Sequence, residues 1–252
     1  MESKFVRRLV AESVGTAMLV LFGAGSVAAA LTVGQGELDY AGLGFICLAF
    51  AIVVALVIYG FGPVSGAHIN PAVTFALAVT RRFPWVEVVP YMLAQLVGAA
   101  FGGLLIVVVF GQNAVDMGVG MTSLADGVSF GEGIVIEALG TFLLMFTIMA
   151  VAVDSRAPAG WAGFLIGLAV AGAILLIGPQ TGGSLNPART FGPDLAAAIF
   201  GGDVQWGQFV LYWIGPLLGA TAATLLYDFV AETRTAGVPK EEASTPTSDG
   251  DS

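Results

Sequence analysis

Apolar blocks separated by short polar segments run along this 252-residue chain, and six of them are long enough to cross a bilayer. Each holds about 20 residues with almost no charge, the length that an α-helix needs to span the hydrocarbon core. The composition agrees, with 57% hydrophobic residues, 11% charged residues and a mean hydropathy of +0.89. The pattern predicts an all-α membrane protein with spanning helices over residues 9–31, 41–61, 85–110, 132–153, 160–178 and 208–230.

The first apolar block also has the beginning expected of a secretory signal peptide. Lys4, Arg7 and Arg8 precede it, and small residues at 28–30 follow its apolar core. Glu12 argues against this alternative, because an acidic residue is out of place in a signal core. The same segment is also echoed later in the chain, so we interpret it as the first spanning helix.

The tripeptide Asn-Pro-Ala occurs twice, beginning at Asn70 and at Asn186. Asn is a favoured helix N-cap and Pro fits the first helical position, so each copy predicts the start of a helix. The predicted helices, residues 71–80 and 187–200, are too short to cross a bilayer alone. At about 1.5 Å per residue they cover roughly 30 Å together, which is one bilayer core. The pair therefore predicts two re-entrant half-helices that form a seventh, discontinuous span.

The order of motifs repeats once along the chain. Residues 12–19 (ESVGTAML) match 137–144 (EALGTFLL), and residues 91–99 match 212–220. Each half has three spans, an odd number, so the second half enters the membrane from the opposite side and a pseudo-two-fold axis lies in the membrane plane. We divide the chain into a first half-repeat (1–120), an inverted second half-repeat (121–230) and a disordered acidic tail (231–252).

The basic residues predict the orientation in the membrane. With a cytoplasmic N-terminus, eight of the nine Lys and Arg residues fall on the cytoplasmic side, and Arg189 alone falls outside. This bias predicts a multi-pass protein of the cell membrane with cytoplasmic N- and C-termini. The acidic residues behind the net charge of −9 lie mostly in loops and the tail, where they are expected to affect only the solvation of the protein. Because the net charge is negative, we expect no nucleic-acid partner. A high-salt habitat is one hypothesis for the acidic excess.

The chain has a single cysteine, Cys47, and a single histidine, His68. One of each excludes an intrachain disulfide and argues against a Cys- or His-based metal site. The chain also shows no grouping of a nucleophile with a base. We therefore expect no enzyme activity, no metal and no cofactor.

Both half-helices are expected to point their positive N-terminal ends at the membrane midplane. Asn70 and Asn186 cap them through the side-chain oxygen and offer amide N–H groups to a lumen. The preceding segments, 62–68 and 178–184, are too rich in Gly and Pro for helix and predict irregular backbone with carbonyl acceptors along a wet path. Such a path suits small neutral polar molecules and excludes cations. The residues expected to line it with backbone are Gly66, Ala67, His68, Gly182 and Ser184.

The loops SGAHINPAVT, from Ser65, and GSLNPARTFGP, from Gly183, resemble the signature loops of the aquaporin and aquaglyceroporin (major intrinsic protein) family. Over about residues 5–230 the chain is similar to an archaeal or bacterial member. The resemblance implies a homotetramer with one pore per subunit. It also implies an outer selectivity filter, which the family's spacing assigns to Phe50, Ile174, Gly183 and Arg189. Water-selective members usually have His at the position of Ile174, so a wider and more apolar filter is expected here.

The resemblance implies a passive channel for water, with small neutral solutes such as glycerol as further candidates and with ions and protons excluded. A channel with glycerol as its main solute is one alternative. A proton-coupled transporter that uses the buried acids Glu12 and Glu137 is an alternative of a different class. The symmetric placement of these acids favours a structural role instead, in which they hold backbone N–H groups of the two loops.

Overall fold

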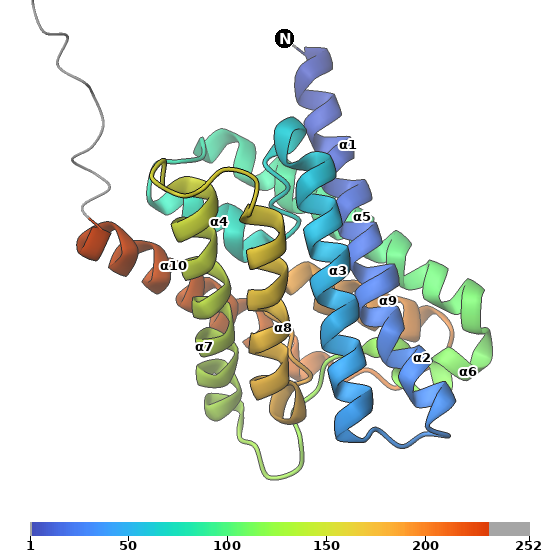
Figure 1. The fold of residues 1–252 in the computed structure, drawn as a ribbon. Coiled ribbons are helices and arrows are strands. Elements are labelled where there is room, and N and C mark those ends of the chain that lie inside the picture. The colour runs from blue at the N-terminus through green and yellow to red at the C-terminus, as the bar shows by residue number, and fades with distance from the viewer. Residues whose placement is uncertain (1, 232–252) are drawn as a thin grey trace, which may run out of the picture.

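In the computed structural model, which describes residues 2–231, six membrane-length helices pack together with two half-helices and one further short helix (Figure 1). The spanning segments are Ser3–Val33, Tyr40–Ser65, Trp85–Phe110, Phe130–Val153, Ala162–Thr181 and Trp206–Ala231. The six predicted spans are confirmed, with ends that differ by a few residues. Apart from residue 231, the predicted disordered tail lies outside the described residues.

The first span is continuous but not uniform. It consists of α1 (Glu2–Met18), a π-helical segment (Leu19–Ala24) and α2 (Gly25–Val33). A second π-helical segment, Met149–Val153, ends the fourth span. The other α-helices are α3 (Tyr40–Ser65), α4 (Pro71–Val79), α5 (Trp85–Phe110), α6 (Gln112–Asp116), α7 (Phe130–Ile148), α8 (Ala162–Thr181), α9 (Pro187–Ile199) and α10 (Leu211–Ala231).

The two half-helices α4 and α9 begin where the sequence predicts. The Oδ1 atom of Asn70 accepts a hydrogen bond from the backbone N–H of Ala72 at 2.9 Å. Asn186 Oδ1 accepts the equivalent bond from Ala188, also at 2.9 Å. Both asparagines have extended backbone and are followed by Pro at the first helical position. The N-cap prediction is therefore confirmed at both loops.

The prediction of irregular backbone over residues 62–68 and 178–184 is wrong for the first four residues of each segment. Helix α3 continues through Pro63, and α8 continues through Pro179. Each proline lies in the last turn, where its missing N–H removes a single hydrogen bond, so the helix tolerates it. The irregular backbone begins at residues 66 and 182, which are glycines with φ of +90° and +76° that end the two helices in left-handed conformation.

Close helix contacts recur at matched positions of the two halves. A Cβ atom on Gly98 in α5 would overlap the carbonyl oxygen of Ser13 in α1. A Cβ atom on Gly219 in α10 would overlap the carbonyl oxygen of Ala138 in α7. Small residues allow helices to approach this closely in membranes. Because these contacts occupy matching places in the sequence repeat, they support the proposed division into two half-repeats.

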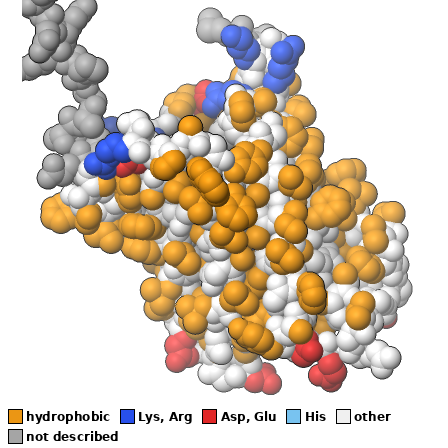
Figure 2. All heavy atoms as spheres, in the orientation of Figure 1, with side chains coloured by type: hydrophobic (Ala, Val, Ile, Leu, Met, Phe, Trp, Pro, Cys, Tyr) orange, Lys and Arg blue, Asp and Glu red, His pale blue; other side chains and the backbone are white. Residues whose placement is uncertain are grey.

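The outer surface of the bundle is apolar between two charged ends. On the face drawn in Figure 2, hydrophobic side chains cover the middle. Lys and Arg gather at the end that carries the N-terminus, with a few acidic side chains among them, and Asp and Glu without Lys or Arg lie at the opposite end. Large apolar side chains such as Val86, Val108 and Phe229 are more than three-quarters exposed. This surface suits a hydrocarbon environment, and the protein is a multi-pass membrane protein.

Candidate channel and selectivity filter

The loops that precede α4 and α9 meet each other inside the bundle. Asn70 Nδ2 donates to the carbonyl oxygen of Leu185 at 2.9 Å, and Asn186 Nδ2 donates to that of Ile69 at 2.8 Å. These reciprocal bonds tie the start of each half-helix to the opposite loop. One N–H of each amide is thereby used within the protein, so a solute in the lumen has the second N–H of each asparagine to bond with.

The residues just before the two asparagines have unfavourable backbone. Ile69 has a φ of +43° and Leu185 a φ of +55°. Left-handed backbone at a non-glycine residue costs about 1–3 kcal/mol and persists only where surrounding contacts hold it. Those contacts come from the two buried acids, because Glu12 Oε2 accepts from the N–H of Ile69 at 2.7 Å and Glu137 Oε2 accepts from that of Leu185 at 2.8 Å.

Both acids are fully buried and surrounded by hydrogen-bond donors. Neither is among the residues that line the central cavity described below. Both carboxylates are thus occupied in shaping the loops. The remaining donors to Glu12 are Ser65 Oγ (2.7 Å), His68 N (2.9 Å) and Gln95 Nε2 (2.8 Å), and those to Glu137 are Thr181 Oγ1 (2.6 Å) and Ser184 N (2.9 Å).

A cavity of about 510 Å³ runs past the junction of the two loops, between helices α3, α7 and α8. Its wall is mostly apolar, and polar groups from both loops interrupt it. Of the predicted lining and filter residues, the structure places nine in this wall: Phe50, Gly66, Ala67, His68, Asn70, Ile174, Ser184, Asn186 and Arg189. Within the described part of the chain, Gly182 and Gly183 are not part of the wall.

These two glycines pack against neighbouring residues. A Cβ atom on Gly182 would lie 2.9 Å from Thr122 Cα, so this position is a close backbone contact. A Cβ atom on Gly183 would lie 3.3 Å from Ile174 Cγ1, and the φ of Gly183 is +62°. Gly183 therefore leaves room for the side chain of Ile174, which itself faces the cavity.

Arg189 and Phe50 lie next to each other in the wall. Arg189 is 2% exposed, its Nη1 donates to the carbonyl oxygen of Gly120 at 2.6 Å, and its Cζ lies 5.2 Å from the centroid of the Phe50 ring. Among the described residues its Nε has no hydrogen-bond partner. Unpaired donors are rare at buried positions, so a water or hydroxyl group in the cavity is the partner expected for this N–H.

Two glycines that the motifs do not single out position two of the predicted filter residues, Arg189 and Phe50. The carbonyl oxygen that accepts from Arg189 belongs to Gly120. The φ of Gly120 is +77°, and a Cβ atom at this position would overlap the carbonyl oxygen of Ala24. A Cβ atom on Gly23 would lie 2.5 Å from Cε1 of the Phe50 ring. In the sequence both residues are glycines in apolar surroundings, a signal shared by many packing positions, so the motifs alone do not identify them.

His68 lines the cavity beside the first loop. Its Nδ1 lies 3.1 Å from Thr74 Oγ1, and its ring packs against Phe83 (4.8 Å between centroids) and Tyr91 (5.4 Å). These contacts hold the His68 ring beside the first loop. Among the described residues, no group of three or more His, Cys, Asp or Glu side chains is arranged to hold a metal ion.

Six spanning helices, two half-helices joined at their N-termini and a cavity that passes this junction define a polytopic membrane channel. The family model described as "Major intrinsic protein" matches residues 1–227. The chain therefore belongs to the major intrinsic protein family, which consists of channels and not enzymes.

Individual relatives agree with this assignment. The chain is 48% identical to a protein described as probable aquaporin AqpM of Archaeoglobus fulgidus, over 92% of this chain and 100% of the relative. It is 46% identical to aquaporin AqpM of Methanothermobacter marburgensis, over 89% and 97%. Among solved structures, the aquaglyceroporin from Plasmodium falciparum is similar with a TM-score of 0.78 at 25% identity, covering 90% of this chain and 97% of that one.

Proposed function

We propose that this protein is a passive water channel of the cell membrane that also admits small neutral solutes such as glycerol and excludes ions and protons. The observation that carries the proposal is the wall of the cavity. Asn70 and Asn186, which cap two opposed half-helices, line the same cavity as the buried guanidinium of Arg189. The relatives named aquaporins support this assignment.

Exclusion of cations follows from three sources of positive potential in one apolar wall. The N-terminal ends of α4 and α9 each carry about half a positive charge, and Arg189 adds a full one. With few polar groups nearby to screen them, these charges repel a cation strongly. Neutral water is not repelled, and its oxygen can accept a hydrogen bond from an asparagine N–H at the junction.

Exclusion of protons follows from the same junction. A water whose oxygen accepts from both asparagine amides turns its own hydrogens away along the cavity. The chain of water hydrogen bonds then changes direction at this point, which interrupts a continuous proton path. We assign Asn70 and Asn186 to this role, and Arg189 reinforces it electrostatically.

The filter composition supports admission of solutes larger than water. Where Phe50 and Ile174 line the cavity, the wall is apolar apart from Arg189. An apolar wall beside one strong donor suits a molecule with both hydroxyl groups and a hydrocarbon backbone, as glycerol has. The fold is also shared with a protein described as an aquaglyceroporin.

Two further features of the assembly belong to this proposal. We place both termini in the cytoplasm, which is supported by the basic end of the surface in Figure 2 and the charge bias of the sequence. We also propose a homotetramer with one pore per subunit, in keeping with the family resemblance. Chemical cross-linking in membranes tests this state, and a monomer alone would contradict it.

The proton-coupled alternative is disfavoured by the two buried acids. Glu12 and Glu137 accept hydrogen bonds from loop backbone and lie outside the cavity wall, so neither has a direct contact with a solute path. Reconstituted vesicles provide the test. A passive channel equilibrates water and glycerol without moving protons, whereas a coupled transporter acidifies or alkalinises the vesicle as solute enters.

A further inference from the structure

A second guanidinium lines the cavity, at the end away from Arg189. Helices α4 and α9 point their N-termini at each other, so the residues just beyond the C-terminal end of α4 lie at one end of the cavity. Arg82 follows α4 there and is part of the cavity wall, together with Ala152 and Val153 from the end of the fourth span. We call this end of the cavity, lined by Arg82, Ala152 and Val153, the inner mouth.

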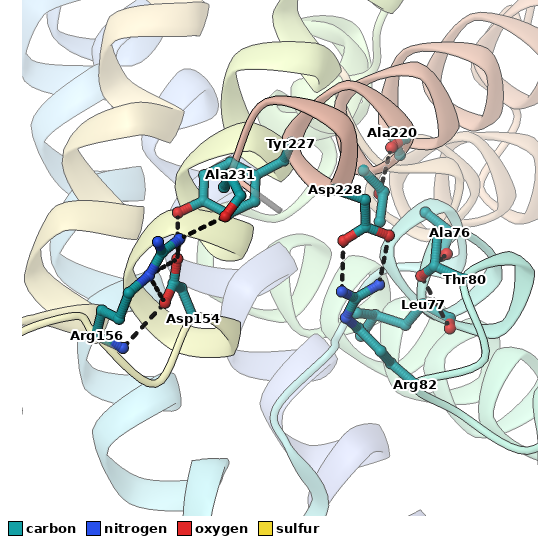
Figure 3. A network of polar contacts seen from close by, with 11 residues as sticks. Ala76, Leu77, Thr80, Arg82, Asp154, Arg156, Ala220, Tyr227, Asp228 and Ala231 are labelled. Carbon is teal, nitrogen blue, oxygen red and sulfur yellow. Dashed lines mark hydrogen bonds and ion pairs between the residues drawn. The ribbon is translucent and has the colours of Figure 1, made fainter. Parts of the chain in front are cut away.

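Asp228 holds the side chain of Arg82 by two hydrogen bonds. Nη1 of Arg82 donates to Oδ2 of Asp228 at 2.9 Å, and Nη2 donates to Oδ1 (Figure 3). The Arg82 side chain is 20% exposed and the Asp228 side chain 5%. Asp228 lies in the last turn of α10, far from Arg82 in the sequence. The pair is therefore a bidentate, largely buried contact between the inner mouth and the C-terminal helix.

The backbone at Arg82 is fixed independently of this pair. Its N–H donates to the carbonyl oxygen of Leu77 at 2.8 Å, and the hydroxyl of Thr80 donates to that of Ala76 at 3.0 Å. These bonds close the C-terminal end of α4, as Figure 3 shows for Thr80. Any displacement of the guanidinium then occurs by rotation of a long, flexible side chain.

We propose that Asp228 is a positioning residue for conduction, because it keeps the guanidinium of Arg82 against α10 and out of the inner mouth. This role rests on the proposed water-channel function. A charged group that loses a buried counter-ion is strongly disfavoured where it stands and moves towards water. For Arg82 the cavity that it already lines is such a wet space. Without the two bonds to this carboxylate the balance shifts, so the guanidinium occupies the inner mouth and narrows it in a larger fraction of the molecules.

The expected effect is moderate. We compare molecules in which the Arg82 side chain is held against α10 with those in which it is displaced into the inner mouth. A tenfold change in this ratio on loss of the charge-assisted pair corresponds to a free-energy difference of about 1.4 kcal/mol. If the ratio changes from about ten to one to about one to one, half of the channels are narrowed at any moment. If the displaced guanidinium closes the channel to water, vesicle swelling then slows about twofold.

The test is stopped-flow osmotic swelling of proteoliposomes, with the incorporated protein quantified for each variant. We expect Asp228→Asn to swell about twofold more slowly than the wild type, and Asp228→Glu, which keeps the charge, to swell faster than Asp228→Asn. The double variant Arg82→Gln with Asp228→Asn should also swell faster than Asp228→Asn. Asp154→Asn is the matched control, since Asp154 forms an Arg pair at the same end of the molecule but is not among the cavity-lining residues.

The outcomes separate this role from a structural one. A double variant as slow as Asp228→Asn would mean that the pair only stabilises the fold, and it would overturn the proposal. Asp228→Asn at the wild-type rate would overturn it as well, with the proposed function intact. Wild-type vesicles that swell no faster than empty ones would contradict the proposed function, and the positioning role with it.

Discussion

Replacement of Glu137 by glutamine removes one acceptor from the second loop at almost constant volume. The carboxylate accepts from Thr181 Oγ1 and Ser184 N through Oε1, and from Leu185 N through Oε2. A glutamine side chain retains one oxygen, which can keep the first two bonds. Its NH₂ group then faces the N–H of Leu185. Both groups are donors, so the N–H of Leu185 loses its acceptor at a residue whose φ is +55°.

The cost follows from this geometry. A hydrogen bond to a charged group contributes about 1.5–3 kcal/mol, and a buried donor left unpaired costs about 1–3 kcal/mol. We therefore expect Glu137→Gln to lower the free energy of unfolding by about 2–4 kcal/mol. Leu185 also carries the carbonyl that accepts from Asn70, so the junction of the two loops shifts and water permeability falls.

Denaturation in detergent measures the stability, and stopped-flow swelling measures the permeability. Glu37→Gln is the control, because Glu37 lies exposed in a loop and its replacement should change neither quantity. Glu12→Gln is expected to cost about 1 kcal/mol less than Glu137→Gln. The reason is Gln95, whose buried Oε1 has no partner among the described residues and can turn to accept from the new amide. A Glu137→Gln variant with wild-type stability and permeability would refute this account of the loops.

Three further predictions concern the filter and the charged end of the molecule. Arg189→Val removes the buried cation and should raise glycerol and proton flux relative to water flux; unchanged selectivity would count against its filter role. Gly23→Ala should push the Phe50 ring towards Arg189, lower the free energy of unfolding by about 1–3 kcal/mol and slow the osmotic swelling of vesicles. Swelling at the wild-type rate would show instead that the ring has room to move. Hydrogen bonds from the Arg156 guanidinium hold the pKa of Asp154 below its ordinary value of about 3.9. The pair therefore stabilises the fold fully at pH values above about 3.9. This contribution to stability is lost as the pH falls through the lowered pKa of the folded state. The stability difference between the wild type and Asp154→Asn, followed by denaturation against pH, should therefore shrink below about pH 4, and a pH-independent difference would contradict the assignment.

The regular parts of the fold are predictable because they depend on local pattern. Twenty apolar residues in a row have few alternatives to a spanning helix, and Asn-Pro at the end of a Gly-rich stretch starts a helix by capping chemistry alone. Pro63 and Pro179 mislead the prediction, because a proline in the last turn costs one hydrogen bond and the helix simply continues.

The candidate site is predictable only where a motif carries it. Asn70 and Asn186 follow from local pattern, and the repeat draws attention to Glu12 and Glu137. The carbonyl of Gly120 and the missing side chain of Gly23 matter because of residues distant in the sequence, so no local pattern reports them. The same holds for the pair that joins Arg82 to Asp228, since its two members are 146 residues apart. Such contacts require the three-dimensional arrangement.

Stopped-flow permeability of the purified wild-type protein in proteoliposomes, measured for water and for glycerol over a range of temperatures, tests the central claim most directly. A channel lined by Asn70, Asn186 and Arg189 should accelerate osmotic water flow well above that of empty vesicles, with a low activation energy and no proton leak. Glycerol should also enter, more slowly than water. Water flow at the rate and activation energy of the bare bilayer, or flow that requires a proton gradient, would contradict the proposed function.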